Sequence, residues 1–209
     1  MRQKDTSVAV LAGGDSRRFG SDKALARFRG HSLIEHMVGI AQRISRTVSV
    51  VVSTDKQAEA VRPLVGGATV YVDPEGSERC ALTGALTAFE FSPSRYTLLL
   101  PVDTPLASPM LLEALVDLAE GHGAVVPRWP SGYIEPLHSV YLSEHAYSRG
   151  LEVYNKGGRR MSELLAVLNH VLYVSTSSLK VFDSALRTFD NVNTADDLRR
   201  LERETSRAS

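Results

Sequence analysis

The stretch Val8-Ala9-Val10-Leu11-Ala12-Gly13-Gly14 decides the fold, because an apolar run of strand length ends there in paired glycines. Such a run is typical of a buried strand, and glycines directly behind it let the backbone approach a ligand closely. Arg17, Arg18 and Lys23 lie within ten residues of the glycines. Backbone amides and cationic side chains together suit a multiply charged anion such as a triphosphate. The alternative is a glycine-rich turn with solvated charges.

This loop differs from both standard phosphate-binding patterns. After Gly14, a P-loop would need glycine in place of Phe19 and lysine in place of Gly20, and a dinucleotide fingerprint would need glycine in place of Asp15. We therefore interpret the stretch as a phosphate-binding loop of another kind.

Hydrophobic periodicity predicts a regular alternation of helices and strands after the loop. Helices are expected at His31 to Ile44 and at about 56–64, 82–91 and 110–120, and strands at 47–52, 68–72, 96–100 and 124–126. Units of strand, helix and strand form parallel sheets through right-handed crossovers. We predict an α/β fold, a Rossmann-like three-layer α/β/α sandwich with a mostly parallel sheet and a ligand crevice at the carboxyl ends of its strands.

The second half of the chain is less regular. Residues 134–141 fit a strand entered through Pro136, and a helix over 161–168 and a strand over 171–174 follow. A last helix is expected to open near Asn191 and to end near Glu202. A chain of 209 residues suits one domain, which we place at residues 1–204 with a frayed tail at 205–209.

Composition limits the classes of partner and compartment. Lys plus Arg and Asp plus Glu balance at 24 each, which argues against broad attraction to nucleic acid or to a membrane surface. Cys80 is the only cysteine, so no intrachain disulfide can form. No apolar run in the sequence approaches the roughly 18 residues that span a bilayer. We expect a cytoplasmic protein with neither a nucleic-acid nor a membrane partner.

Polar or flexible residues follow each of the first four predicted strands. In chain order these are Gly13 and Gly14, Ser53 and Asp55, Asp73, and Asp103. The carboxyl ends of parallel strands meet at one edge of a sheet, so we expect one site. Asp103, with Pro101 and Pro105 on either side, suits Mg²⁺, an ion that takes one or two protein carboxylates and shares its shell with substrate phosphates. Capping of the following turn is the alternative role for this aspartate.

Residues 11–25 read Leu-Ala-Gly-Gly-x-Ser-Arg-Arg-Phe-Gly-x-Asp-Lys-Ala-Leu, which resembles the signature loop of the molybdenum cofactor guanylyltransferase family. The segments Pro-Val-Asp-Thr-Pro at 101–105 and Asn-Val-Asn-Thr at 191–194 extend the resemblance over nearly the whole chain. It implies a fold of the nucleotide-diphospho-sugar transferase type. It also implies transfer of GMP from GTP to the terminal phosphate of molybdopterin, with release of pyrophosphate and Mg²⁺ as the cofactor. The N-terminal half would bind the nucleotide, and about 127–204 would form the acceptor-binding side.

The resemblance assigns roles to individual residues. Lys23 would bind a phosphate, Arg17 and Arg18 the leaving pyrophosphate, and Asp103 the metal. The nucleotide-binding set would be Leu11, Ala12, Gly13, Gly14, Lys23, Ser53, Asp73 and Asp103. Without the resemblance, a surface lysine is the usual interpretation of Lys23, and a turn residue before Pro74 is an equal alternative for Asp73.

Two positions depart from the family pattern. Ser53 stands where bacterial members carry asparagine, and a hydroxyl can replace one hydrogen bond of an amide but not two. Cys80-Ala81-Leu82-Thr83-Gly84 stands where Gly-Pro-Leu-Ala-Gly is common. We interpret Cys80 as a small buried thiol rather than a nucleophile.

The acceptor-binding candidates have plain structural alternatives. Asn191 and Asn193 belong to the family segment, although Thr194 and Asp197 have the spacing of a capping box that starts a helix. Arg159 and Arg160 would face a second phosphate or simply enter a helix. Glu135 would face the acceptor or the metal, or lie on a polar strand edge. Zinc is not expected, because the six histidines form no HxxH or HxxxH pair.

The choice of base and the class of function each leave an alternative. Leu-Ala-Gly-Gly is associated with guanine in the resembled family, which favours GTP over CTP. Another nucleotidyltransferase of this fold would use CTP or a sugar-phosphate or cofactor-phosphate acceptor. A non-catalytic GTP-binding protein that delivers the cofactor would need the glycine loop but not Asp103. The resemblance also implies transient contact with molybdoenzymes or other cofactor-biosynthesis proteins.

Overall fold

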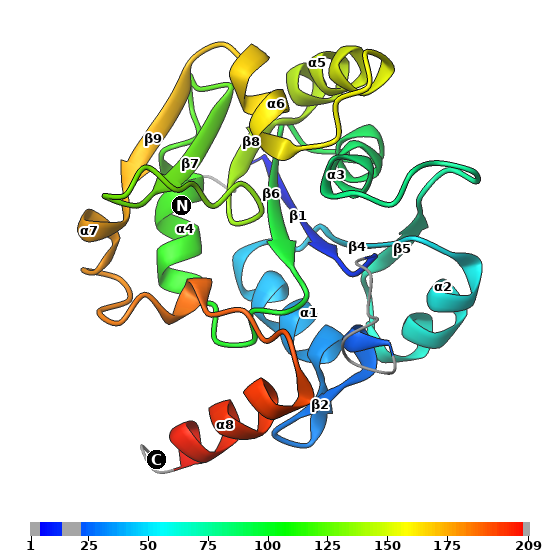
Figure 1. Cartoon of the computed structure of the whole chain (residues 1–209), viewed down its shortest axis with the longest axis vertical. Coiled ribbons are helices and arrows are strands. Elements are labelled where there is room, and N and C mark those ends of the chain that lie inside the picture. Colours follow the sequence, from blue (N-terminus) through cyan, green and yellow to red (C-terminus); the bar gives the residue numbers. More distant parts are fainter. Residues whose placement is uncertain (1–4, 14–21, 207–209) are drawn as a thin grey trace.

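The computed structural model describes residues 5–13 and 22–206, and a seven-stranded sheet forms its centre (Figure 1). The strands lie in the order β5-β4-β1-β6-β8-β7-β9. Strand β8 is antiparallel to β6 and β7, whereas the other neighbouring pairs are parallel. The strand bounds are Thr6–Leu11 (β1), Val48–Val52 (β4), Thr69–Val72 (β5), Tyr96–Pro101 (β6), Ala124–Arg128 (β7), Val140–Leu142 (β8) and Val171–Ser175 (β9).

Helices cover both faces of the sheet (Figure 1). One face carries α1 (Leu33–Ile44), α2 (Asp55–Val61) and α4 (Pro109–Asp117), and the other carries α3 (Ala81–Glu90), α5 (Ser143–Asn155) and α6 (Met161–Val167). The structure also contains a short hairpin of β2 (Arg27–Phe28) and β3 (His31–Ser32), helices α7 (Thr176–Leu179) and α8 (Ala195–Ser206), and three short 3-10 helices, Lys23–Leu25, Arg62–Leu64 and Arg187–Phe189. The predicted mostly parallel α/β/α fold is confirmed.

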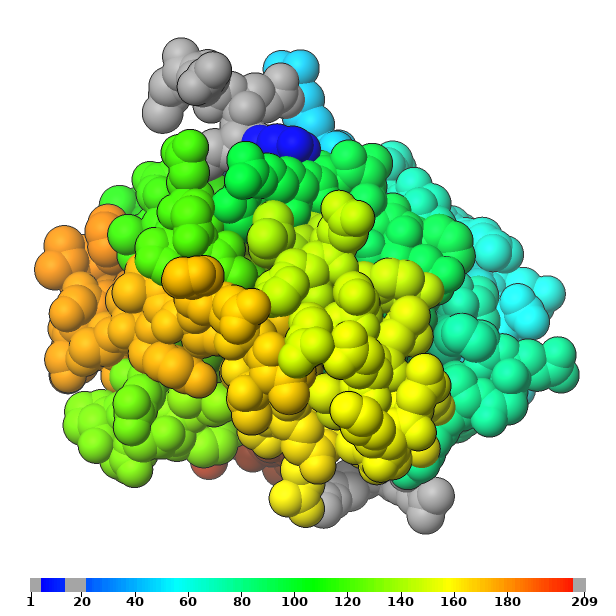
Figure 2. All heavy atoms as spheres, turned by 90° about the horizontal axis from the view of Figure 1, so that it is seen from above, coloured from blue at the N-terminus to red at the C-terminus, as the bar shows by residue number. Residues whose placement is uncertain are grey.

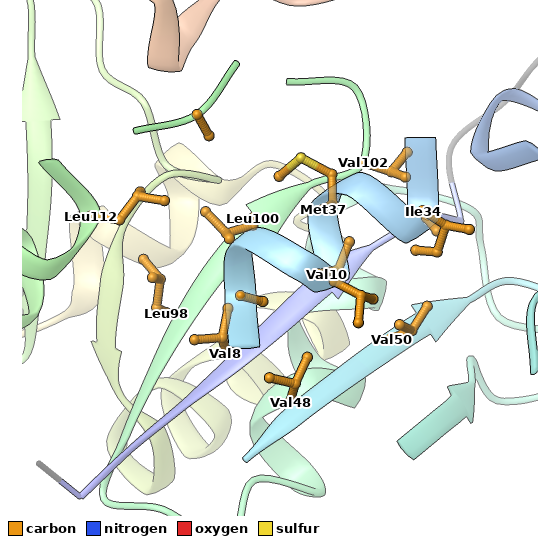
Figure 3. Packing of buried hydrophobic residues seen from close by; sticks show 14 of the residues in the cluster. Val8, Val10, Ile34, Met37, Val48, Val50, Leu98, Leu100, Val102 and Leu112 are labelled. Atoms are coloured by element: carbon orange, nitrogen blue, oxygen red, sulfur yellow. The ribbon is translucent and has the colours of Figure 1, made fainter. Parts of the chain in front are cut away.

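Alternation of side chains along the strands produces two cores. Val8 and Val10 of β1 pack with α1 on one face, whereas Ala9 between them belongs to the cluster under α3. Figure 3 shows the first cluster, where Val8 and Val10 of β1 lie between Leu98 and Leu100 of β6 and Val48 and Val50 of β4, with Met37 of α1 near Leu100. The buried central strands fix the positions at which their carboxyl ends leave the sheet.

Most of the predicted elements are present, with small differences at their ends. Helix α1 begins at Leu33 rather than His31, because Ser32 and Glu35 form a capping box in front of it. The last helix extends to Ser206, past the expected end near Glu202. Its start has the expected capping geometry, since the Asp197 amide donates to Thr194 Oγ1 at 3.1 Å and the Thr194 amide donates to Asp197 Oδ2 at 2.9 Å.

The strand predicted over residues 134–141 was wrong for most of its length. Strand β8 covers only Val140–Leu142, and Ile134 forms a single bridge with Arg128. A turn lies between them, in which the His138 amide and the Ser139 hydroxyl both donate to the Glu135 carbonyl. Pro136 has no amide hydrogen for a strand ladder, and this agrees with a turn at that point.

Helix α5 is absent from the sequence-based prediction. Its buried residues are the small Ser143, Ala146 and Gly150, so the sequence lacks the large apolar residues at helical spacing that predict an amphipathic helix. A Cβ atom on Gly150 would lie 2.7 Å from a methyl carbon of Leu86, so α5 packs against α3 at close range. Figure 2 shows this side of the molecule, with the yellow-green and yellow residues of α5 and α6 beside the orange residues of β9 and α7.

None of the helices within residues 5–13 and 22–206 has the length and apolar character needed to cross a lipid bilayer.

Candidate functional site

A cavity of about 390 Å³ opens at the carboxyl ends of β1, β4, β5 and β6. It is lined by residues within or just after the ends of these four strands, by the start of α3 and the two residues before it, and by Lys23 and Leu137. The full lining is Leu11, Ala12, Gly13, Lys23, Val51, Ser53, Asp73, Arg79, Cys80, Ala81, Gly84, Pro101, Val102, Asp103 and Leu137. The structure thus brings Gly13, Ser53, Asp73 and Asp103 together around one cavity. Asp55 is instead the first residue of α2 and does not line the cavity.

An ion pair between Lys23 and Asp103 lies at the β6 end of the cavity. Lys23 Nζ is 2.7 Å from Asp103 Oδ2, and the two side chains are only 18% and 21% exposed. Lys23 is the first residue of a short 3-10 helix, Lys23–Leu25. Asp22 caps this helix, because its side chain accepts a hydrogen bond from the Ala24 amide at 3.0 Å. The chain thus brings a cation and a carboxylate together across 80 residues of sequence.

The second oxygen of Asp103 is available to a cation. Asp103 Oδ1 is buried and accepts no hydrogen bond within the part of the chain that the structure describes. The described residues contain no group of three or more His, Cys, Asp or Glu side chains that could hold a metal by themselves. Mg²⁺ is commonly held by one or two carboxylates together with substrate phosphates. Asp103 therefore fits a divalent cation whose remaining ligands come from a bound polyphosphate and water.

Gly13, Ser53 and Asp73 form a hydrogen-bonded row at the other end of the cavity. The Ser53 hydroxyl donates to the Gly13 carbonyl at 2.6 Å and lies 3.3 Å from Asp73 Oδ2. A Cβ atom at position 13 would lie 2.3 Å from Ser53 Oγ, so this approach of β1 and β4 requires glycine. The Thr87 hydroxyl of α3 donates to Asp73 Oδ1 at 2.7 Å. Desolvation by burial raises the pKa of Asp73, although these two hydrogen bonds partly oppose the shift.

The sequence of this chain matches a known protein family over most of its length. Residues 8–171 match the MobA-like NTP transferase domain. The chain belongs to this family. It is therefore a nucleotidyltransferase.

Relatives of the family cover nearly the whole chain. A probable molybdenum cofactor guanylyltransferase of Methanosarcina mazei is 30% identical over 92% of this chain and 88% of its own length. The crystal structure of molybdopterin-guanine dinucleotide biosynthesis protein A from Archaeoglobus fulgidus matches with a TM-score of 0.81 at 29% identity, over 96% of this chain and 99% of that one. A Mycobacterium tuberculosis protein in complex with manganese shares the fold, with a TM-score of 0.65 at 20% identity over 95% of this chain and 98% of that one.

Part of the family loop lies outside the described residues. Gly14, predicted to bind the nucleotide, and Arg17 and Arg18, predicted to bind the pyrophosphate, fall within 14–21. Leu11, Ala12, Gly13 and Lys23 flank that segment and line the cavity. The roles of the two arginines stay predictions.

The acceptor candidates do not line the cavity, and most of them bind other parts of the protein. Asn193 lies closest to it, with its Oδ1 3.5 Å from Lys23 Nζ. The amide of Val192 donates to the Asp103 carbonyl at 2.8 Å, so the family segment 191–194, including Asn191, runs beside the metal candidate. Arg159 pairs with Glu78 at 2.7 Å, and the amide of Arg160 donates to Glu163 at the start of α6.

Glu135 is engaged within the acceptor half. The Trp129 indole donates to its Oε1 at 2.7 Å, and its Oε2 lies 3.8 Å from His138 Nδ1. Desolvation by burial raises the pKa of Glu135, and the same cause lowers the pKa of the buried His138 to about 3. His138 therefore stays a neutral imidazole, with its Nε2 3.2 Å from Thr104 Oγ1 beside Asp103.

Several residues of the site escaped the sequence analysis. Gln57 accepts from the Ser53 amide and donates to Asp22, which joins the Ser53 end of the cavity to the start of the Lys23 helix. Thr87 orients Asp73 from two turns into α3. Arg79 and Leu137 line the cavity directly. Cys80 also lines it and is only partly buried, with its Sγ 3.2 Å from Thr83 Oγ1, so the expectation of a buried thiol was wrong. The contacts of Gln57 with Asp22 and of Thr87 with Asp73 join different elements, and no local sequence pattern predicts them.

Proposed function

We propose that this protein is a molybdenum cofactor guanylyltransferase, which transfers GMP from GTP to the terminal phosphate of molybdopterin and releases pyrophosphate. The observation that supports it most directly is the meeting of Lys23 and Asp103 in one cavity, with a buried Asp103 oxygen that has no hydrogen-bond partner among the described residues. Relatives that match more than nine-tenths of the chain carry this activity in their names.

The reaction requires charge compensation and orientation rather than a nucleophilic side chain. An oxygen of the acceptor phosphate forms a bond to the α-phosphorus of GTP, and the bond from that phosphorus to the bridging oxygen of the β-phosphate breaks, with pyrophosphate leaving in line. Lys23 would neutralise charge that builds on the phosphate oxygens, and electrostatic stabilisation of this kind is typically a large part of catalysis. Arg17 and Arg18 would bind the pyrophosphate.

Asp103 would hold Mg²⁺, which when bound supplies Lewis-acid stabilisation of the phosphate oxygens. Because Lys23 pairs with Oδ2, Oδ1 is left for the metal. The ion pair also holds the carboxylate in one orientation. The ammonium and the metal would then act on the same polyphosphate from two sides.

The nucleoside would occupy the opposite end of the cavity, on Leu11, Ala12, Gly13, Ser53 and Asp73. The acceptor would approach from the side of residues 127–204, where Asn193 is nearest to Lys23. Asn191, Glu135, Arg159 and Arg160 are the other candidates on that side. The proposal places the protein in the cytoplasm, with transient contact to molybdoenzymes or to other proteins of cofactor synthesis.

Product identification tests the proposal. Purified protein is given molybdopterin, Mg²⁺ and each nucleoside triphosphate in turn, and the products are identified by mass. We expect the guanine dinucleotide from GTP, with one pyrophosphate released per product. Faster product formation from CTP would overturn the choice of base. GTP binding without pyrophosphate release would favour a non-catalytic cofactor-delivery protein.

A further inference from the structure

Arg79 is a cationic residue of the cavity to which the proposed reaction gives no role. It lies in the segment 73–80, which connects the carboxyl end of β5 to the start of α3, and it lines the cavity with Cys80 and Ala81. Its guanidinium forms no ion pair or hydrogen bond with another residue in the part of the chain that the structure describes, whereas the neighbouring Glu78 has partners for its amide, its carbonyl and its carboxylate. The side chain is thus placed to meet a ligand.

The backbone at Arg79 is held from three directions through Glu78. The Glu78 amide donates to the Tyr154 hydroxyl at 3.2 Å, and the Glu78 carbonyl accepts from the Thr83 hydroxyl at 2.6 Å. The Glu78 carboxylate pairs with Arg159 at 2.7 Å, and the Arg159 guanidinium lies 4.2 Å from the centre of the Tyr154 ring. Because Glu78 is committed to Arg159, the acid adjacent to Arg79 in sequence does not neutralise it.

The position of Arg79 associates it with the base rather than with the phosphates. The sheet order places β4 and β1 between β5, which leads to Arg79, and β6, which leads to Asp103. Asp73, at the start of the same segment, accepts a hydrogen bond from Thr87 of α3, which anchors the segment on the β5 side of the cavity. The phosphate-binding pair Lys23 and Asp103 lies on the β6 side.

We propose that Arg79 reads the guanine base by donating two hydrogen bonds to its O6 and N7 atoms. This inference rests on the proposed function and adds a residue that determines base specificity. A guanidinium has a planar fork of donors that matches these two acceptors, and the same bidentate pair is the commonest specific contact to guanine in the major groove of DNA. Adenine presents a donor in place of O6, and cytosine has no equivalent of the N7 and O6 pair, so both lose the bidentate contact.

Nucleotide binding without the acceptor tests this role. Affinities for GTP, 7-deaza-GTP, ATP and CTP are measured by titration calorimetry with Mg²⁺ for the native protein, Arg79→Lys and Arg79→Gln. Lysine keeps the charge but loses the fork. We expect both variants to lose roughly tenfold or more in GTP affinity and to bind GTP and 7-deaza-GTP equally, whereas the native protein prefers GTP. Arg62→Lys, at an exposed arginine that does not line the cavity, should retain the preference.

The outcomes separate this inference from the proposed function. If the native protein does not distinguish GTP from 7-deaza-GTP, or if both variants keep the native preference, the role of Arg79 is overturned. An equal loss of affinity for all four nucleotides would also overturn it, because that result indicates a phosphate contact. An Arg79-dependent preference for GTP in a protein that forms no molybdopterin product would support the base contact and overturn the proposed transfer.

Discussion

The two oxygens of Asp103 have different surroundings, and this difference allows a test at the level of one atom. Oδ2 accepts from Lys23, and Oδ1 is buried without a partner among the described residues. In Asp103→Asn we expect pyrophosphate release from GTP to fall on the order of 10²- to 10³-fold, because the side chain loses the charge that would hold the cation. The thermal midpoint should change little. Release that stays at the native rate would contradict a role for Asp103 in metal binding.

Gly13 and Ser53 allow a second test, based on steric fit. In Gly13→Ala the new methyl group would lie 2.3 Å from Ser53 Oγ. We expect a loss of about 1–3 kcal/mol in the free energy of unfolding, since overpacking in a tight site forces neighbours to move, and a higher KM for GTP. The double variant Gly13→Ala, Ser53→Ala removes the clashing oxygen and should recover part of both losses. Denaturant titration and steady-state kinetics give the two numbers. Losses that simply add would show that the clash is not the cause.

At the scale of single residues, the sequence was informative where a short motif carries the chemistry. Lys23 and Asp103 were found because each lies in a recognisable segment, and the parallel strand order explains why they meet. Arg79 and Gln57 were not found, because their importance comes from contacts with distant segments. A charge or an amide on a loop has no local signature for such contacts.

At the scale of elements, the loop between β5 and α3 is tied to the turn between α5 and α6. The ion pair of Glu78 with Arg159 makes this connection across 81 residues. Its side chains are 62% and 30% exposed, and exposed pairs contribute about 0–1 kcal/mol to stability. The pair is therefore better suited to positioning the cavity wall than to stabilising the fold.

Substitution of Glu78 separates these two roles. In Glu78→Gln we expect the KM for GTP to rise several-fold with little change in the thermal midpoint, because Arg79 and Cys80 lose an anchor while the core is untouched. Glu152→Gln is the matched control, since Glu152 pairs with Arg149 at the same 2.7 Å in a comparably exposed pair away from the cavity. An equal change in KM in both variants, or a change in neither, would show that the Glu78 pair does not position the site.

The elements that were predicted well and those that were missed differ in how they pack. Strands β1, β4 and β6 are buried on both faces, so their sequences are continuous apolar runs of strand length. Helix α5 packs through Ser143, Ala146 and Gly150, whose small size permits close contact with α3 but leaves little hydrophobic periodicity. Short β8 was misplaced because the polar turn before it was read as part of the strand.

At the scale of the whole molecule, the two halves of the sheet meet at β6 and β8. Strands β5, β4, β1 and β6 supply the nucleotide side, and antiparallel β8 joins them to β7 and β9. The turn that precedes β8 places His138 against Thr104, next to Asp103, and His138 also contacts Phe189 edge to face. The joint between the halves thus depends on a buried imidazole, which makes the whole fold sensitive to acid.

The sign of this dependence follows from the pKa of His138. Burial lowers it from 6.5 to about 3, so in that range the unfolded chain binds a proton at this position and the folded chain does not. The free energy of unfolding therefore falls as the pH decreases from 6.5 towards 3, and the contribution of His138 at about pH 4.5 is a loss of about 2–3 kcal/mol. Glu135 and Asp73, whose pKa values burial raises, act in the opposite direction.

A comparison of variants isolates the histidine from these opposing groups. In His138→Gln the side chain keeps a polar contact for Thr104 but does not titrate, so the decrease in the free energy of unfolding between pH 7 and pH 4.5 should be smaller than in the native protein by about 2 kcal/mol. His122→Gln, which replaces a half-buried histidine of the loop between α4 and β7 whose Nδ1 lies 2.9 Å from the Leu118 carbonyl, should keep the native decrease. Urea titrations at the two pH values provide the measurement. Equal decreases in His138→Gln and the native protein would mean that the joint between the two halves tolerates a protonated imidazole.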